Sequence, residues 1–292
     1  MKLVAFDLDG VLVDIDSSWE TVHKAFSTDN EENFQKHLRG EIDFKEFMQS
    51  DIRLWGRTSI KQIANILDKA PIMAAAPEVI DELKKEGFKT AIISSGISLL
   101  AERVKKTLNI DYAYSNKLLV DGDGWLTGEG EEIVSLANKD IVLKRLSEET
   151  GIGLRECAVV GDSRFDIPLF REAGLSIAFN AQDEAVKRAA DLVIDGKDLR
   201  KVLPWLKSEN LMKTEASLRY SSAREAEAIA RSLSTDNAET PLGLQVRTWS
   251  EGKTVKIKVA CIRRVETMLS TLDDIFACMQ VAEKTIKAAR SV

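Results

Sequence analysis

A short apolar run at the N-terminus ends in acidic residues and glycine. Lys2–Leu8 is continuous and β-prone, and Asp9 and Gly10 follow it. The same pattern returns at Cys157–Gly161, which leads into Asp162. Continuous apolar runs are typical of parallel strands buried on both faces, and open α/β sheets bind ligands at the carboxyl ends of such strands. The two runs therefore predict an α/β fold with a site at one edge of its sheet.

Helical and strand patterns alternate between and after these two runs. Further strands are predicted at Thr90–Ser94, Leu175–Phe179 and Leu192–Ile194, with a hairpin over 112–126. This order predicts a Rossmann-like, doubly wound parallel sheet. Residues 15–72 instead carry apolar side chains at helical spacing, which predicts a small helical cap inserted after the first strand.

The pattern changes beyond residue 207. A strand at Glu215–Tyr220, a helix at Ala223–Leu233, a hairpin at Leu244–Ile262 and a long helix at Arg264–Ala289 are expected. This βαββα order predicts a separate α+β domain. We therefore expect two domains, residues 1–207 and residues 214–292, joined by a polar linker.

Composition excludes several classes of protein. The chain has 292 residues and a net charge of -6, which argues against a general nucleic-acid coat. Its two histidines, His23 and His37, lie in a polar helical stretch and are expected at the surface, so histidine-rich metal sites are excluded. The three cysteines lack metal-site spacing, and no apolar run reaches membrane-spanning length or resembles a secretory leader, so a cytoplasmic protein is predicted.

Four acids follow the two apolar runs. Strand alternation aims Asp7 and Asp9 to the same side, and Asp162 and Asp166 come from the second strand end. Carboxylates this close repel one another unless a cation lies between them. Oxygen ligands of this kind suit magnesium, so the sequence predicts a Mg²⁺ site built from all four acids.

An aspartate beside magnesium can attack phosphorus and form an aspartyl phosphate. Asp7 is the predicted nucleophile, and Asp9 is the predicted acid and base that protonates the leaving group and activates water. Lys139, ahead of a helix, and Ser94, at a strand end, supply a cation and a hydroxyl for the phosphoryl oxygens.

These residues fall in four motifs that resemble the haloacid dehalogenase superfamily. The motifs are FDLDGVLVD, IISSG, Lys139 and VVGDSRFD, and the resemblance covers residues 1–207. The dehalogenase branch lacks an acid at the position of Asp9. The resemblance therefore implies a phosphatase rather than a dehalogenase.

Within that superfamily the chain looks most similar to phosphoserine phosphatases, through the cap and the stretches GEIDFKEFM and YAYSNKLLV. The resemblance implies that Asp16 holds a substrate ammonium and that a cap arginine holds its carboxylate. Where that arginine is expected, in FMQSDIRLW, this chain has Gln49 and Asp51, with Arg53 displaced along the helix. Phosphatase chemistry survives this departure, but specificity for phosphoserine does not follow.

The second and fourth motifs also depart from that subfamily. The second reads SSG where SGG is typical, and the fourth reads GDSRFD rather than GDGxND. The resemblance still implies that Ser95 and Gly96 contact the substrate beside Ser94.

Residues 214–290 resemble the small dimerising, Pcc-type subunit of the KEOPS tRNA-modifying complex, through SLSTDNAETP and STLDDIF. The resemblance implies a homodimer that can serve as a platform for a tRNA-modification partner. Arg263 and Arg264 could contact RNA or be solvated charges at a helix start. The last helix carries more apolar side chains than a three-stranded sheet must cover, namely Leu269, Leu272, Ile275, Phe276 and Met279.

Three hypotheses follow. The first is a magnesium-dependent phosphomonoesterase that acts on a small phosphorylated metabolite and dimerises through its C-terminal domain. The second is an interaction or regulatory protein of the tRNA threonylcarbamoyl-adenosine machinery, and the third is a phosphomutase or phosphotransferase. The intact set of Asp7, Asp9, Ser94, Lys139 and Asp162 favours the first, because loss of catalysis should have removed at least one of them.

Overall fold

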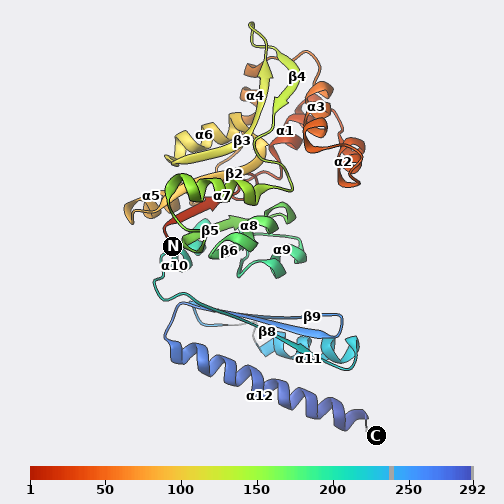
Figure 1. The fold of residues 1–292 in the computed structure, drawn as a ribbon, viewed down its shortest axis with the longest axis vertical. Helices are drawn as coiled ribbons and strands as arrows, with labels where there is room; N and C mark the ends of the chain where they lie inside the picture. Colours follow the sequence, from red (N-terminus) through yellow and green to blue (C-terminus); the bar gives the residue numbers. More distant parts are fainter. Residues whose placement is uncertain (237–239, 291–292) are drawn as a thin grey trace. The chain divides into compact units, whose positions relative to one another are not determined.

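The computed structural model describes residues 1–236 and 240–290. The chain divides into two compact units, Met1–Leu206 and Lys207–Val292 (Figure 1). Part of the SLSTDNAETP stretch, residues 237–239, lies outside the described residues. Among the described residues, no helix is both long and apolar enough to span a membrane.

The first unit is built on a seven-stranded sheet with the order β4-β3-β2-β1-β5-β6-β7. All neighbouring strands pair in parallel except β3 and β4, which are antiparallel. The predicted hairpin is thus the edge of this mostly parallel sheet, because its first strand also pairs with β2. The strands are β1 Leu3–Phe6, β2 Lys89–Ile97, β3 Tyr112–Val120, β4 Leu126–Glu131, β5 Cys157–Gly161, β6 Leu175–Phe179 and β7 Leu192–Ile194.

A helical region follows β1, within the range predicted for the cap. Its helices are α1 Ser18–Phe26, α2 Glu31–Leu38, α3 Phe44–Leu54 and α4 Ile60–Leu67. Side chains that accept from the first turn fix where three of them begin: Ser17 caps α1, and Asp43 and Ser59 form capping boxes with α3 and α4. These local signals explain why the region is helical although it is inserted into a sheet.

The remaining helices of this unit lie between the strands or after the last of them. They are α5 Ala76–Lys85, α6 Ser98–Leu108, α7 Lys139–Thr150, α8 Ile167–Glu172, α9 Glu184–Ala189 and α10 Leu203–Leu206. Short 3₁₀ helices occupy Leu154–Glu156, Arg164–Asp166 and Leu199–Val202.

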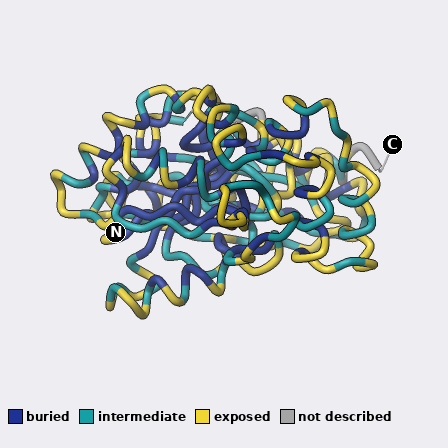
Figure 2. The backbone as a smooth tube through the Cα atoms, turned by 90° about the horizontal axis from the view of Figure 1, so that it is seen from above, coloured by how far each residue is buried: buried dark blue, intermediate teal, exposed yellow. Residues whose placement is uncertain are grey.

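Strand β1 lies at the centre of the sheet and of the core. All its residues are fully buried, and they pair in register with β2 on one side and β5 on the other. Buried positions are drawn dark blue in Figure 2. Because β1 and β5 are parallel neighbours, their carboxyl ends meet at one edge of the sheet, and the Asp7 amide still donates to Val160 O at 2.9 Å. Asp7 and Asp162 therefore leave the sheet at the same place.

The second unit contains a three-stranded antiparallel sheet with the order β8-β10-β9. Its elements are β8 Met212–Arg219, α11 Ala223–Asp236, β9 Leu244–Glu251, β10 Thr254–Cys261 and α12 Val265–Arg290. Val255, Ile257 and Val259 of the central strand are buried with Ile229 and Leu233 of α11. The alternation of buried and partly exposed residues along β10 is what a sheet with one covered face requires.

Candidate active site

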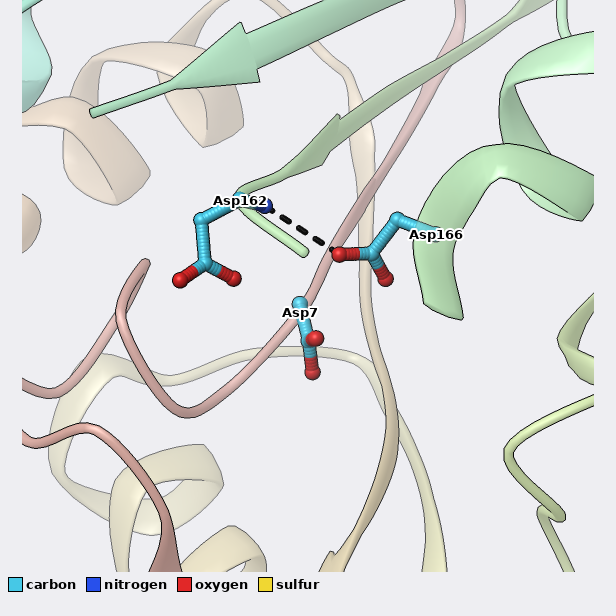
Figure 3. A group of neighbouring side chains, drawn as sticks. All are labelled: Asp7, Asp162 and Asp166. Carbon is cyan, nitrogen blue, oxygen red and sulfur yellow. Dashed lines mark hydrogen bonds between the residues drawn. The ribbon is translucent and has the colours of Figure 1, made fainter. Parts of the chain in front are cut away.

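Three acids converge at the edge where β1 and β5 end (Figure 3). Each of Asp7, Asp162 and Asp166 offers a carboxylate oxygen, and the three oxygens lie within 4.8 Å of one another. Asp7 directly follows β1, Asp162 directly follows β5, and Asp166 ends the short 3₁₀ helix beyond it. Oxygens from neighbouring strand ends at this spacing can share one divalent cation.

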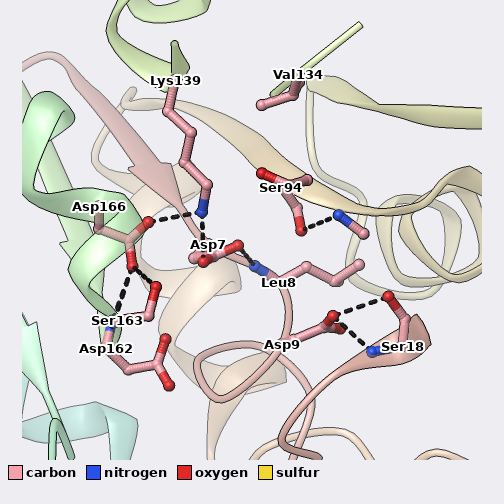
Figure 4. Close-up of polar contacts among 12 residues, drawn as sticks. Asp7, Leu8, Asp9, Ser18, Ser94, Val134, Lys139, Asp162, Ser163 and Asp166 are labelled. Carbon is pink, nitrogen blue, oxygen red and sulfur yellow. Dashed lines mark hydrogen bonds and ion pairs between the residues drawn. The ribbon is translucent and has the colours of Figure 1, made fainter. Parts of the chain in front are cut away.

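Lys139 contacts two of these acids, Asp7 and Asp166 (Figure 4). Its Nζ lies 2.6 Å from Asp7 Oδ2 and 2.7 Å from Asp166 Oδ1, and the side chain is only 2% exposed. Burial alone lowers the pKa of Lys139, but the carboxylates of Asp166 and Asp7 outweigh it and hold the pKa above its usual range. The lysine is therefore a fixed positive charge beside Asp7.

Asp166 is more fully engaged than the other two acids. Its Oδ2 accepts hydrogen bonds at 3.1 Å from the Asp162 amide, the Ser163 amide and Ser163 Oγ, while its Oδ1 faces Lys139. These contacts hold the loop that carries Asp162. Asp166 therefore positions Lys139 and the loop, which leaves Asp7 and Asp162 as the better candidates for direct metal ligands.

The electrostatics of Asp7 and Asp162 also fit a cation. Burial, together with the charge of Asp166, raises the pKa of Asp7 to about 7. Burial, together with the charge of Asp7, raises the pKa of Asp162 to about 8. Gly10 leaves room for the second carboxylate, since a Cβ at this residue would lie 2.1 Å from Asp162 Oδ2. A divalent cation would offset both the burial of these charges and the repulsion between them.

This arrangement predicts a pH-dependent effect of Mg²⁺ on stability. Because both folded-state pKa values lie above the ordinary 3.8, the metal-free protein loses stability as the pH rises from 3.8 through about 7 and 8. A cation that binds the ionised pair restores that stability, by about 2.7 kcal/mol when its concentration is a hundred times its Kd. We expect Mg²⁺ to raise the melting temperature more at about pH 8 than at about pH 5.

Thermal unfolding followed by circular dichroism, with and without Mg²⁺ at both pH values, checks this prediction. Asp162→Asn serves as the comparison, because it removes one of the two expected ligands and should reduce the shift. Equal shifts at the two pH values would show that the ion does not bind this pair of acids.

Asp9 lies outside the three-acid group. Its Oδ2 accepts from the Ser18 amide at 2.7 Å and from Ser18 Oγ at 2.8 Å. Its Oδ1 is buried and has no hydrogen-bond partner in the described part of the chain. Burial raises the pKa of Asp9 despite the hydrogen bonds from Ser18. A carboxyl group with a raised pKa and a free oxygen can exchange protons with a bound substrate.

The end of β2 supplies the predicted phosphate-binding segment. Ser94 is 2% exposed, and its Oγ accepts from the Gly96 amide at 3.1 Å. The Ser95 carbonyl accepts from Trp19 Nε1 at 3.0 Å and from Asn116 Nδ2 at 2.8 Å. A Cβ at Gly96 would lie 2.5 Å from Ser18 Oγ, so only glycine lets the segment pack against the Ser18 that holds Asp9.

A cavity of about 590 Å³ joins this segment to the acids and extends into the helical region. Asp16 lies on the lining as an exposed residue, whereas Arg53 is absent from it. The Arg53 guanidinium instead lies 2.7 Å from Glu129 on β4. Of the predicted site residues, the cavity brings together Asp7, Asp9, Asp16, Ser94, Ser95, Gly96, Lys139 and Asp162.

Sequence patterns missed several residues that organise the site. Ser18 donates to Asp9, Ser163 donates to Asp166, and Asn116 donates to the Ser95 carbonyl. These contacts join segments distant in the chain or lie within one loop. The expectation that His23 lies at the surface was wrong, because it is 2% exposed and lines the cavity. A local signal was present, because His23 lies four residues after Trp19 and next to Val22, on the apolar face of α1.

Comparisons with known proteins show which family the chain resembles. The model of the haloacid dehalogenase-like hydrolase family matches residues 1–174. The phosphoserine phosphatase of Methanocaldococcus jannaschii is 32% identical over 208 residues, which cover 70% of this chain and 98% of that protein.

Solved structures of phosphoserine phosphatases are similar to this chain in fold and in sequence. A substrate-bound phosphoserine phosphatase complex has a TM-score of 0.62 and 30% identity, covering 70% of this chain and 98% of the other. A phospho-aspartyl intermediate analogue of phosphoserine phosphatase also has a TM-score of 0.62 at 30% identity, covering 70% of this chain and 99% of the other. Because the family model matches more than half of this chain, the chain belongs to the haloacid dehalogenase-like hydrolases.

Proposed function

We propose that this chain is a Mg²⁺-dependent phosphatase that hydrolyses a small phosphate monoester through an aspartyl phosphate on Asp7. The observation that carries the proposal is the position of Asp7, beside Asp162 on the neighbouring strand end and 2.6 Å from Lys139. It provides a carboxylate, a fixed cation and a second acid at one point. Phosphoryl transfer requires such charge stabilisation around the attacking and departing oxygens.

The residues can divide the chemistry into two steps. In the first, an Asp7 oxygen attacks phosphorus, the ester P–O bond breaks, and Asp9 gives its proton to the leaving alkoxide. In the second, Asp9 takes a proton from water, the water oxygen attacks phosphorus, and the bond to Asp7 breaks to release inorganic phosphate. Ser94 and Lys139 hold the phosphoryl oxygens throughout. A bound Mg²⁺, held by Asp7 and Asp162, supplies positive charge that offsets the phosphate.

The similarity to phosphoserine phosphatases supports a small, phosphoserine-like metabolite as the substrate. The cavity of about 590 Å³ is large enough for such a molecule. We propose that exposed Asp16, on the cavity lining, contributes to binding a substrate ammonium.

Phosphate release from p-nitrophenyl phosphate by the purified full-length chain tests the proposed function. We expect hydrolysis with Mg²⁺ and little hydrolysis after removal of divalent ions with a chelator. Absence of hydrolysis in both conditions would contradict the proposal.

We further propose that the second unit forms a homodimer through α12. On this helix Val265, Leu269, Phe276 and Val281 are 53%, 56%, 40% and 64% exposed, while Ile275 and Met279 are buried against the sheet. Exposed apolar side chains gathered along one helix are typical of an interface. The resemblance to the dimerising KEOPS subunit supports a second copy of this chain as the occupant.

The dimer makes a prediction about mass in solution. Replacing Leu269 and Phe276 together by lysine is expected to convert a dimer to a monomer, because two charges cannot be buried unpaired in an apolar interface. Light scattering coupled to size-exclusion chromatography measures the mass. Ile141→Lys, at a residue 53% exposed in the other unit, is the matched control and should leave the dimer intact. A monomeric unmodified chain would contradict the proposal.

A further inference from the structure

The end of the cavity formed by the helical region contains a buried acid that the proposed chemistry does not use. Asp51 of α3 lines the cavity and is 1% exposed. Its Oδ2 accepts from Asn30 Nδ2 at 2.9 Å. Its Oδ1 is buried and has no hydrogen-bond partner among the residues that the structure describes. A buried carboxylate oxygen without a donor is costly, so a donor from a bound ligand would relieve that cost.

The neighbouring histidine does not neutralise this acid. Trp55 Nε1 lies 3.2 Å from His23 Nδ1, and an indole nitrogen can only donate, so Nδ1 must be the acceptor. The proton of His23 is then on Nε2, which lies 3.4 Å from Asp51 Oδ2. With Nδ1 acting as an acceptor, the imidazole cannot also carry a proton there, so His23 brings no formal positive charge to Asp51.

The other charges of this end of the cavity are also mainly negative. Asp16, Glu20, Asp29 and Glu31 line it as well. Lys24 lines it too and lies 2.9 Å from Glu20, so this pair cancels and Asp16, Asp29 and Glu31 remain in excess. A substrate carboxylate here would face an excess of like charge, whereas an ammonium group would be attracted.

Aromatic side chains complete this part of the lining. Trp19, Phe34, Phe44 and Phe47 all contribute to it. Aromatic faces attract organic cations and offer nothing to a carboxylate. An acid set among aromatic rings is therefore suited to a small ammonium group.

Ordered contacts connect Asp51 to the phosphate-binding segment. Trp19 donates to the Ser95 carbonyl at 3.0 Å, and its ring stacks on that of Trp55 with centroids 5.5 Å apart. The Trp55 ring in turn contacts His23, with centroids 5.4 Å apart, and His23 lies against Asp51. These contacts fix the position of Asp51 relative to the phosphate-binding segment. The site can therefore select substrates by length.

We propose that Asp51 determines specificity, and that the preferred substrate is the phosphate monoester of a small amino alcohol without a carboxylate. The inference rests on the proposed phosphatase function and narrows its substrate class. The ammonium of such a substrate pairs with Asp51, with Asp16 on the same lining, while its phosphate lies at Asp7.

Two substrates that differ in a single group test this inference. O-phosphoethanolamine and O-phosphoserine both carry an ammonium, and only the second carries a carboxylate. For the full-length chain with Mg²⁺, we expect kcat/KM to be at least tenfold higher for phosphoethanolamine, and higher than for glycerol phosphate, which lacks the ammonium. An equal or higher value for phosphoserine or glycerol phosphate would overturn the inference.

p-Nitrophenyl phosphate separates this failure from failure of the proposed function. Hydrolysis of p-nitrophenyl phosphate without a preference for phosphoethanolamine refutes the role of Asp51 alone. No hydrolysis of any ester refutes the phosphatase function, and the inference with it.

An Asp51→Asn variant tests the residue itself. It keeps the shape of the side chain and the contact with Asn30 but removes the charge, so the preference for phosphoethanolamine over phosphoserine should fall at least fivefold. Asp68→Asn is the matched control, because Asp68 is exposed and absent from the lining, and it should keep the preference of the unmodified chain. An unchanged preference in a folded Asp51→Asn protein, with folding checked by thermal unfolding, would exclude Asp51 as the determinant.

Discussion

Replacing Asp7 by asparagine is expected to lower the hydrolysis of p-nitrophenyl phosphate by at least about a thousandfold. The amide has nearly the shape of the carboxylate, and its oxygen can still accept from the Leu8 amide, which donates to Asp7 Oδ1 at 2.7 Å. It is, however, a poor nucleophile and a poor ligand for a divalent cation. The loss should therefore appear in kcat, because no aspartyl phosphate can form.

The measurement needs a control for the loss of one aspartate from the same segment. Asp14→Asn fits, because Asp14 is the last residue of the same motif, is absent from the cavity and pairs at 2.6 Å with Lys197 at the surface. This variant should keep the rate of the unmodified chain within about twofold, since surface ion pairs contribute little. Equal rates for Asp7→Asn and the unmodified chain would remove Asp7 as the nucleophile.

Asp9→Asn is expected to lower kcat/KM for an alkyl phosphate by about 10²- to 10⁴-fold. This constant reports the steps up to formation of the aspartyl phosphate, in which Asp9 must protonate the leaving alkoxide. The asparagine can keep its contact with Ser18, which now donates to Asp9 Oδ2, but it has no acidic proton to give. The raised pKa of Asp9, caused first by burial, favours a protonated carboxyl group that can give this proton.

The choice of leaving group distinguishes an acid from a residue that only shapes the site. p-Nitrophenolate departs readily without a proton, whereas an alkoxide does not. The loss of kcat/KM in Asp9→Asn should therefore be much smaller for p-nitrophenyl phosphate than for the alkyl ester. Equal losses on both would indicate that Asp9 acts by positioning Ser18 and the helix it begins.

The sequence alone determined the strand ends and their acids. A buried parallel strand is a continuous apolar run, and the residues that follow it must lie at the carboxyl edge of the sheet. Both the apolar run and the acid that follows it can be read from a few consecutive residues. Asp7 and Asp162 could therefore be assigned to the same edge of the sheet from the sequence near each of them. The observed pairing of β1 with β5 then places them together.

Only the tertiary structure decided which acids the buried lysine contacts. Lys139 contacts Asp7 across 132 positions of the chain, and Asp166 is engaged by that lysine and by its own loop. The same holds for the substrate end of the cavity, where Arg53 turns to Glu129 while His23 and Asp51 are buried together. Side-chain direction on a helix depends on what packs against it, and that information lies in distant segments rather than in the helix itself.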